Sequence, residues 1–242
     1  MTAHMLLPDL PAYAEVKAHA AALKQASLER LFEEDDSRAE TFSLEAAGLQ
    51  LDYSKHLLNH DALASLLNLA TQAGLHQSIV DLFSGKPVNN TENRPALHTL
   101  LRASSSEGHT DKFKDVVATR GRMQAIAQRL NRGEHTGYSG AVITDVVNIG
   151  IGGSDLGPRL VTSALKPFQG NIRCHYVANA DPADLQETLL HLDAASTLFI
   201  ICSKSFRTEE TLANSLEARA WMLTAGAKAT ELEKHFLAIT TN

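Results

Sequence analysis

Two short segments combine glycine, hydroxyl and basic residues where a strand-like run gives way to a helix-like one. The first, GIGGSDLGP at 150–158, overlaps the end of the β-branched run 145–153. The second, SKSFRTEET at 203–211, overlaps the end of the apolar run 196–205. Glycines let a backbone turn tightly, and unpaired N–H groups at a helix N-terminus bind anions. Each segment therefore has the composition of a phosphate-binding turn.

The glycine-rich segment has two other interpretations. Gly150 and Gly152 match the first two glycines of the dinucleotide fingerprint G-x-G-x-x-G. The third glycine of that pattern falls on Asp155, which would place a carboxylate against a pyrophosphate. The second interpretation is a tight turn without any ligand, in which Ser154 or Asp155 caps the following helix. This segment alone leaves all three interpretations open.

The second segment carries several hydroxyls, a lysine and an arginine at the start of a helix, among them Ser203, Ser205, Thr208, Lys204 and Arg207. Hydroxyls and N–H groups at such a place bind phosphate oxygens, and the helix dipole favours the negative charge. The alternative is an ordinary helix start, with Thr208 as N-cap and Glu209 and Glu210 facing the dipole. The two interpretations are compatible, because the same helix end can be capped when no ligand is bound.

An alternating series of strands and helices positions both segments. The pattern predicts strands at 145–153, 172–179, 196–205 and 235–242, and helices at 155–167, 181–193 and 208–226. Apolar strands alternating with helices indicate a parallel sheet covered on both faces. In the strand order 2-1-3-4-5, strands one and three are neighbours and the crevice between them binds ligands. We therefore expect one small phosphorylated ligand between the two segments.

An acidic residue after the second strand bears on the choice between a monophosphate and a dinucleotide. Asp181 stands where a ribose-binding acid could lie, but it directly precedes Pro182. Proline favours the first turn of a helix, so Asp181 is better explained as a helix cap. This favours a monophosphate ligand.

The first part of the chain is dominated by helical periodicity. It predicts helices over 13–35, 61–85 with a break near Gly74, 94–103 and 111–133, and a strand or hairpin piece at 48–54. We divide the chain into a helical N-terminal region, residues 1–137, and a sheet domain, residues 138–242. Because the sequence stops directly after a strand, we expect the sheet domain to be cut short at its C-terminus.

Composition excludes several classes of protein. A net charge of -6 argues against an electrostatic nucleic-acid binder. The sequence shows neither a signal peptide nor an apolar run long enough to span a membrane. Cys174 and Cys202 lie in apolar runs and are expected to be buried, reduced thiols. His56 and His60 could share a helix face, but no third ligand is near, so no metal site is expected.

Longer motifs favour one of these interpretations. The stretch VVNIGIGGSDLGPRLVTSALKP (146–167) resembles the signature of the glucose-6-phosphate isomerase family. The stretch SKSFRTEETLAN (203–214) resembles that family's second sugar-phosphate loop. The similarity continues in LDYSK (51–55), TENRPALHTLLR (91–102) and KHFLAITTN (234–242), so it covers nearly the whole chain.

The resemblance implies an α/β fold, an SIS-type doubly wound parallel sheet preceded by a helical arm. It implies the reversible interconversion of glucose 6-phosphate and fructose 6-phosphate in glycolysis and gluconeogenesis. The implied protein is cytoplasmic and homodimeric at full length, and needs no metal or organic cofactor. By resemblance, Gly153 and Ser154 contact the substrate, and the phosphate is held by Ser203, Lys204, Ser205 and Thr208.

The second loop departs from the family pattern at three positions. Ser205 stands where threonine is common, Arg207 where a small hydroxyl residue is common, and Glu209 where glutamine is common. Because Arg207 and Glu209 appear together, a local ion pair of Arg207 with Glu209 or Glu210 explains both changes. The alternative is a bidentate contact between Arg207 and the phosphate.

No catalytic residue is assigned in this chain. The resemblance implies a glutamate base, assisted by histidine and lysine, in the later half of the family's chain, and this sequence contains none of those motifs. We therefore expect the chain to bind the substrate phosphate without isomerase activity of its own. The alternative function is a non-catalytic SIS module that senses sugar phosphates.

Overall fold

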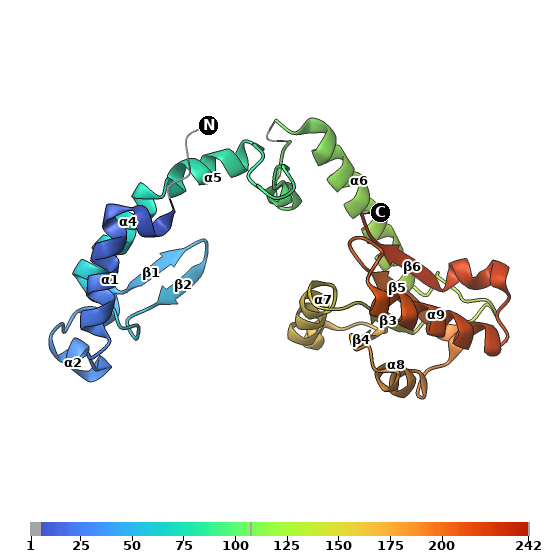
Figure 1. Ribbon diagram of the computed structural model, residues 1–242. Helices are drawn as coiled ribbons and strands as arrows, with labels where there is room; N and C mark the ends of the chain where they lie inside the picture. Colours follow the sequence, from blue (N-terminus) through green and yellow to red (C-terminus); the bar gives the residue numbers. More distant parts are fainter. Residues whose placement is uncertain (1–5, 107, 242) are drawn as a thin grey trace. The chain divides into compact units, whose positions relative to one another are not determined.

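The structure is a computed structural model that describes residues 6–106 and 108–241 (Figure 1). It contains two compact units, Met1–Val116 and Val117–Asn242. Helix α6 (Thr110–Asn131) crosses the boundary between them. The units thus divide N-terminal to the expected boundary at 137/138, because Leu130 of α6 packs against the sheet of the second unit.

The first unit is mainly helical. Its helices are α1 (Pro11–Leu23), α2 (Leu28–Glu33), α3 (Arg38–Thr41), α4 (His60–Gln72) and α5 (Leu75–Phe83), with 3-10 turns at Leu7–Asp9 and His98–Leu101. A hairpin of β1 (Ser43–Ala46) and β2 (Leu49–Asp52) confirms the expected strand near 48–54. Gly74, with φ +73°, separates α4 from α5 as expected.

Three expectations for the first unit are wrong. The helix expected from residue 13 onward is interrupted, because α1 ends at Leu23 and α2 begins at Leu28, after Ser27, whose side chain caps it by accepting from the Arg30 N–H. Residues 94–103 form only the short 3-10 turn at His98–Leu101. Arg94 precedes Pro95 and exchanges backbone hydrogen bonds of 3.1 and 3.3 Å with Asn89, which holds it extended. His56 and His60 do not share a helix face, since α4 begins at His60.

The second unit contains a four-stranded parallel sheet. Its strands are β3 (Asp145–Ile149), β4 (Arg173–Val177), β5 (Thr197–Cys202) and β6 (Phe236–Ile239), in the order β4-β3-β5-β6. Its helices are α7 (Gly153–Ala164), α8 (Pro182–Leu189) and α9 (Glu209–Thr224), with 3-10 turns at Lys166–Phe168, Ala194–Ser196 and Ala229–Lys234. The expected adjacency of the first and third strands is confirmed, since β3 pairs in parallel with β5.

Both faces of this sheet are covered, which explains the continuous apolar strands. On one face, Val147 and Phe199 pack in a cluster with Met222 of α9. On the other face, Val146 and Leu198 pack with Leu130 of α6. The expected α/β fold with a doubly covered parallel sheet is confirmed.

Two polar groups are buried at the end of the sheet where the strands begin. Asp145 is 1% exposed and accepts hydrogen bonds of 2.6 and 2.8 Å from Arg173 and one of 2.8 Å from His175. His235, 0% exposed, donates from Nδ1 to the Thr197 carbonyl at 2.6 Å and accepts at Nε2 from the Tyr138 N–H at 2.8 Å. Both residues tie the strand ends together.

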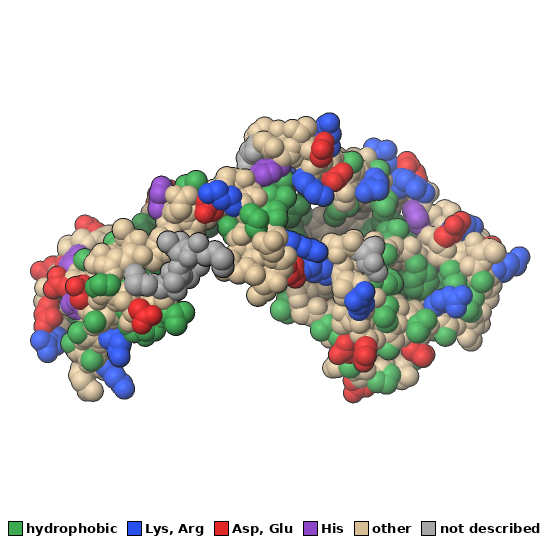
Figure 2. Space-filling model, turned by 45° about the horizontal axis from the view of Figure 1, so that its top comes forward, with side chains coloured by type: hydrophobic (Ala, Val, Ile, Leu, Met, Phe, Trp, Pro, Cys, Tyr) green, Lys and Arg blue, Asp and Glu red, His purple; other side chains and the backbone are tan. Residues whose placement is uncertain are grey.

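The two cysteines are less buried than expected. Both thiols are free, but Cys174 is exposed and Cys202 half-buried, so the expected burial is wrong. Cys174 lies on the edge strand β4 and lines an apolar cavity of about 420 Å3. Hydrophobic side chains reach the surface in both units (Figure 2), among them Leu67, Leu75, Leu160 and Phe168.

Within the described ranges, no helix has the length and apolar composition needed to cross a membrane. The same residues contain no group of three or more His, Cys, Asp or Glu side chains arranged to hold a metal ion.

Candidate functional site

The glycine turn after β3 is tightly constrained. A Cβ atom on Gly150 would lie 2.9 Å from the Cys202 carbonyl oxygen and 2.9 Å from the Ser154 Cβ atom. Gly152 has φ +60°, a conformation that favours glycine. Because the chain has already turned at Gly152, α7 begins at Gly153 with Gly152 as its N-cap. The expectation that Ser154 or Asp155 caps this helix is therefore wrong.

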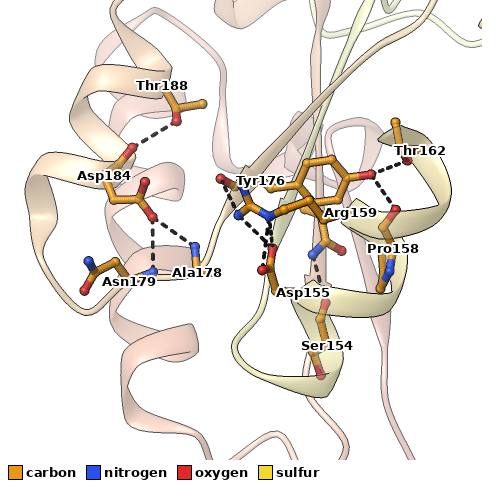
Figure 3. Close-up of polar contacts among 11 residues, drawn as sticks. Ser154, Asp155, Pro158, Arg159, Thr162, Tyr176, Ala178, Asn179, Asp184 and Thr188 are labelled. Atoms are coloured by element: carbon orange, nitrogen blue, oxygen red, sulfur yellow. Dashed lines mark hydrogen bonds and ion pairs between the residues drawn. The ribbon is translucent and has the colours of Figure 1, made fainter. Parts of the chain in front are cut away.

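Asp155 instead forms an ion pair within α7 (Figure 3). Its carboxylate is nearly buried and lies 2.9 and 3.1 Å from two guanidinium nitrogens of Arg159. The Arg159 guanidinium lies over the Tyr176 ring at 5.1 Å, and the Tyr176 hydroxyl contacts Thr162 and the Pro158 carbonyl. This network turns the Asp155 charge toward β4 and neutralises it.

Carboxylates at the start of α8 accept hydrogen bonds from the backbone N–H groups of the turn after β4. Asp184 accepts hydrogen bonds from the Ala178 and Asn179 N–H groups at 3.0 and 3.1 Å (Figure 3). Asp181 accepts from the Ala183 N–H at 2.9 Å, which confirms its expected role as helix cap. Asn214 of α9 donates to the Asn179 carbonyl at 2.8 Å. These backbone donors are therefore already occupied.

The loop after β5 is organised differently. Thr208 is the N-cap of α9, as expected, but its side chain makes no capping hydrogen bond. Its hydroxyl lies 3.3 Å from the hydroxyl of Ser203, which is almost completely buried. Phe206 has φ +54° and packs against the main core cluster, so it anchors the loop on the sheet.

The start of α9 has donors without partners. Among the described residues, the N–H groups of Glu209, Glu210 and Thr211 have no hydrogen-bond acceptor. The Thr211 hydroxyl is also unpartnered there, although the residue is only 1% exposed. A buried hydroxyl without a partner costs about 1–3 kcal/mol. Unpaired donors at the positive end of a helix favour an anion.

The structure brings the expected site residues to one edge of the sheet. Gly153 and Ser154 lie in the first turn of α7, after β3. The loop between β5 and α9 holds the other five: Ser203, Lys204, Ser205, Arg207 and Thr208. Since β3 and β5 are parallel neighbours, both segments leave the same edge of the sheet.

The expected ion pair of Arg207 is absent. Within the described ranges, Arg207 forms no ion pair with Glu209 or Glu210, and its side chain is exposed. Arg207 precedes the N-cap Thr208 and so lies outside α9, where the spacings that bring helix side chains together do not apply. The guanidinium is left available for another anion.

Sequence reasoning missed several residues that shape this edge. Asn148 of β3 donates to the Ser154 carbonyl at 3.0 Å and fixes the glycine turn. Asp184 and Thr211 both stand at the third position of their helices, where a side chain can reach backbone N–H groups. The four-residue spacing of Asp155 and Arg159 was a sequence signal from which their ion pair could have been predicted.

Comparison with known proteins places this chain in a family. The sequence model of the family Phosphoglucose isomerase matches residues 52–242. This chain belongs to the phosphoglucose isomerase family. The glucose-6-phosphate isomerase of Saccharophagus degradans is 46% identical over 228 residues, which are 94% of this chain and 42% of that protein. That of Shewanella loihica is 44% identical over 241 residues, or 98% of this chain and 44% of that protein.

A solved structure shares the fold. The glucose-6-phosphate isomerase from Chlamydia trachomatis matches 98% of this chain and 46% of its own, with a TM-score of 0.81 and 23% sequence identity. The chain thus spans less than half the length of the phosphoglucose isomerase relatives that it matches.

Proposed function

We propose that this chain supplies the sugar-phosphate-binding part of a longer protein that interconverts glucose 6-phosphate and fructose 6-phosphate. Family membership supports the reaction. The observation that carries the proposal is the edge shared by β3 and β5, where one turn is tight and glycine-rich and the other has unpartnered donors. A phosphate held there leaves the sugar beside the glycine turn.

Each expected residue has a role that its chemistry supports. Ser203, Ser205 and Thr208 offer hydroxyls, and Lys204 adds a charge that attracts the phosphate dianion. At Gly153 the sugar can approach the backbone closely, because a glycine has no side chain. Ser154 next to it offers a hydroxyl. The described residues provide no hydrogen-bond partner for the Ser154 hydroxyl, which leaves it free to bind substrate.

The turn after β4 favours a monophosphate over a dinucleotide. A dinucleotide fold uses an acidic residue after the second strand for the ribose hydroxyls. Here Asp181 caps α8, and Asp184 occupies the Ala178 and Asn179 N–H groups. Neither carboxylate is free for a ribose.

Proton transfer needs a base, and the aspartates at this edge do not provide it. The isomerisation moves a proton between adjacent carbons, which requires a general base within hydrogen-bond reach of the carbon-bound proton. Asp155, Asp181 and Asp184 are each engaged in an ion pair or in backbone hydrogen bonds. We infer that the base, a glutamate by family resemblance, is not in this chain, so the chain alone is inactive.

The test measures binding and turnover separately on the purified chain. We expect it to bind fructose 6-phosphate in calorimetric titrations, but neither fructose nor NAD, and to show no turnover in a coupled assay. Thr208→Val should weaken this binding about tenfold, and Thr188→Val, which removes a hydroxyl bonded to the Asp184 carbonyl, should not. Equal binding of fructose and fructose 6-phosphate would refute the phosphate site, and turnover would refute inactivity.

We propose that the longer protein is a cytoplasmic homodimer, by resemblance to its family. Sedimentation of the longer protein gives its mass directly. A monomer at micromolar concentration, or recovery in a membrane or secreted fraction, would contradict this part of the proposal.

A further inference from the structure

The segment after β6 holds the β5–α9 loop from one side. The carbonyl oxygen of Lys204 accepts hydrogen bonds from the Thr240 hydroxyl at 3.1 Å, the Thr241 hydroxyl at 2.8 Å and the Thr241 N–H at 3.0 Å. One residue earlier, the Ser203 N–H donates to the Ile239 carbonyl at 3.1 Å. Four hydrogen bonds thus tie the beginning of this loop to residues 239–241.

These bonds fix the direction of one peptide group. The carbonyl and N–H of a trans peptide unit point in opposite directions, and no peptide bond of the described residues is cis. With its carbonyl directed at Thr240 and Thr241, the Lys204–Ser205 peptide directs its N–H away from them. That Ser205 N–H has no acceptor among the described residues. A loop that presents N–H groups and withdraws carbonyl oxygens attracts anions.

Two observations elsewhere in the loop agree with this arrangement. Phe206, with φ +54°, packs on the core and anchors the loop after Lys204. At the start of α9, the buried Thr211 hydroxyl has no partner among the described residues, which points to a ligand or water that completes its hydrogen bonding. The loop is therefore held on both sides, with unpaired donors between its anchors and α9.

We propose that Thr240 and Thr241 are positioning residues that keep the 203–208 loop in its phosphate-binding conformation. They act through the Lys204 carbonyl and do not touch the ligand. This inference rests on the proposed function, since it concerns the same phosphate site. If both hydroxyls are lost, the Lys204 carbonyl keeps one of its three donors, and the loop visits conformations that do not bind. The apparent affinity then falls in proportion to the binding-competent fraction.

The experiment titrates the chain with fructose 6-phosphate and, separately, with inorganic phosphate. The double variant Thr240→Val/Thr241→Val removes both hydroxyls, and Thr240→Ser/Thr241→Ser retains them. Thr224→Val is the matched control, because it removes a 3.0 Å hydroxyl-to-carbonyl bond at the far end of α9. We expect about tenfold weaker binding of both probes by the valine variant, and affinities within about twofold of the parent for the other two.

A second measurement separates positioning from general stability. Unfolding followed by the fluorescence of Trp221 should have the same midpoint in all four proteins, and the Ser205 amide resonance should shift in the ligand-free valine variant alone. Parent-like affinity of the valine variant, or a serine variant as weak as the valine one, overturns this inference and leaves the proposed function standing. A parent chain that binds neither probe overturns both. A loss of affinity that follows a loss of folding also overturns the inference.

Discussion

Replacing His235 with phenylalanine should destabilise the second unit strongly. His235 is completely buried, donates to the Thr197 carbonyl at 2.6 Å and accepts from the Tyr138 N–H at 2.8 Å. Phenylalanine fits a similar volume but leaves both polar groups without this partner. At about 1–3 kcal/mol for each of the two orphaned groups, the free energy of unfolding should fall by about 2–6 kcal/mol at neutral pH.

The same residue should make stability depend on pH. Burial lowers the pKa of His235 below its ordinary value, although the hydrogen bond to the Thr197 carbonyl acts in the opposite direction. The unfolded chain therefore binds a proton at a higher pH than the folded chain does. The contribution of His235 is fully present above the unfolded pKa of about 6.5 and is lost as the pH falls, by up to about 1.4 kcal/mol per pH unit. The phenylalanine variant should lack this contribution.

Fluorescence of Trp221 gives the assay, because it is the single tryptophan of the chain and packs edge-on against Phe199 at 6.0 Å. Urea unfolding at pH 7.5 and pH 5.5 compares the parent, His235→Phe and the control His191→Gln, whose side chain is exposed. The reasoning is refuted if His235→Phe unfolds within about 0.5 kcal/mol of the parent at pH 7.5. It is also refuted if the parent and the variant lose equal stability between the two pH values.

Three further predictions use the same measurements. Gly150→Ala should cost about 1–3 kcal/mol, because its Cβ would meet the Cys202 carbonyl at 2.9 Å, whereas Gly153→Ala meets nothing within 4 Å and should unfold like the parent. Burial alone would raise the pKa of Asp145, but hydrogen bonds led by that from Arg173 hold it at about 2. Asp145→Asn should therefore lose about 2 kcal/mol at pH 7, and the parent should lose that contribution as the pH falls from about 4 to 2. Arg207→Thr should weaken fructose 6-phosphate binding about tenfold at low salt and less at high salt, and an unchanged affinity would mean that the guanidinium does not contact the phosphate.

The sequence by itself determined the fold class and brought the two candidate loops to one edge of the sheet. The strand at 145–149 has Val146 on one face and Val147 and Ile149 on the other, and all five of its residues are buried, as expected in a sheet covered on both sides. A helix follows each of β3, β4 and β5, which makes neighbouring strands parallel and brings the segments after β3 and β5 together. The role of Asp181 as a helix cap could also be predicted from the sequence, because Pro182 and the Ala183 N–H lie within two residues of it.

Only the tertiary structure decided which polar groups at that edge are occupied and which are left open. Asp184 accepts hydrogen bonds from the N–H groups of Ala178 and Asn179. Thr240 and Thr241 donate to the Lys204 carbonyl across 36 and 37 residues. Arg207 forms no ion pair with its acidic neighbours among the described residues. A local sequence pattern reveals only those partners of a side chain that lie within about one helical turn, so it predicts caps and turns. Partners that are distant in sequence are chosen by strand order and packing, and these determine which donors at that edge stay unpaired.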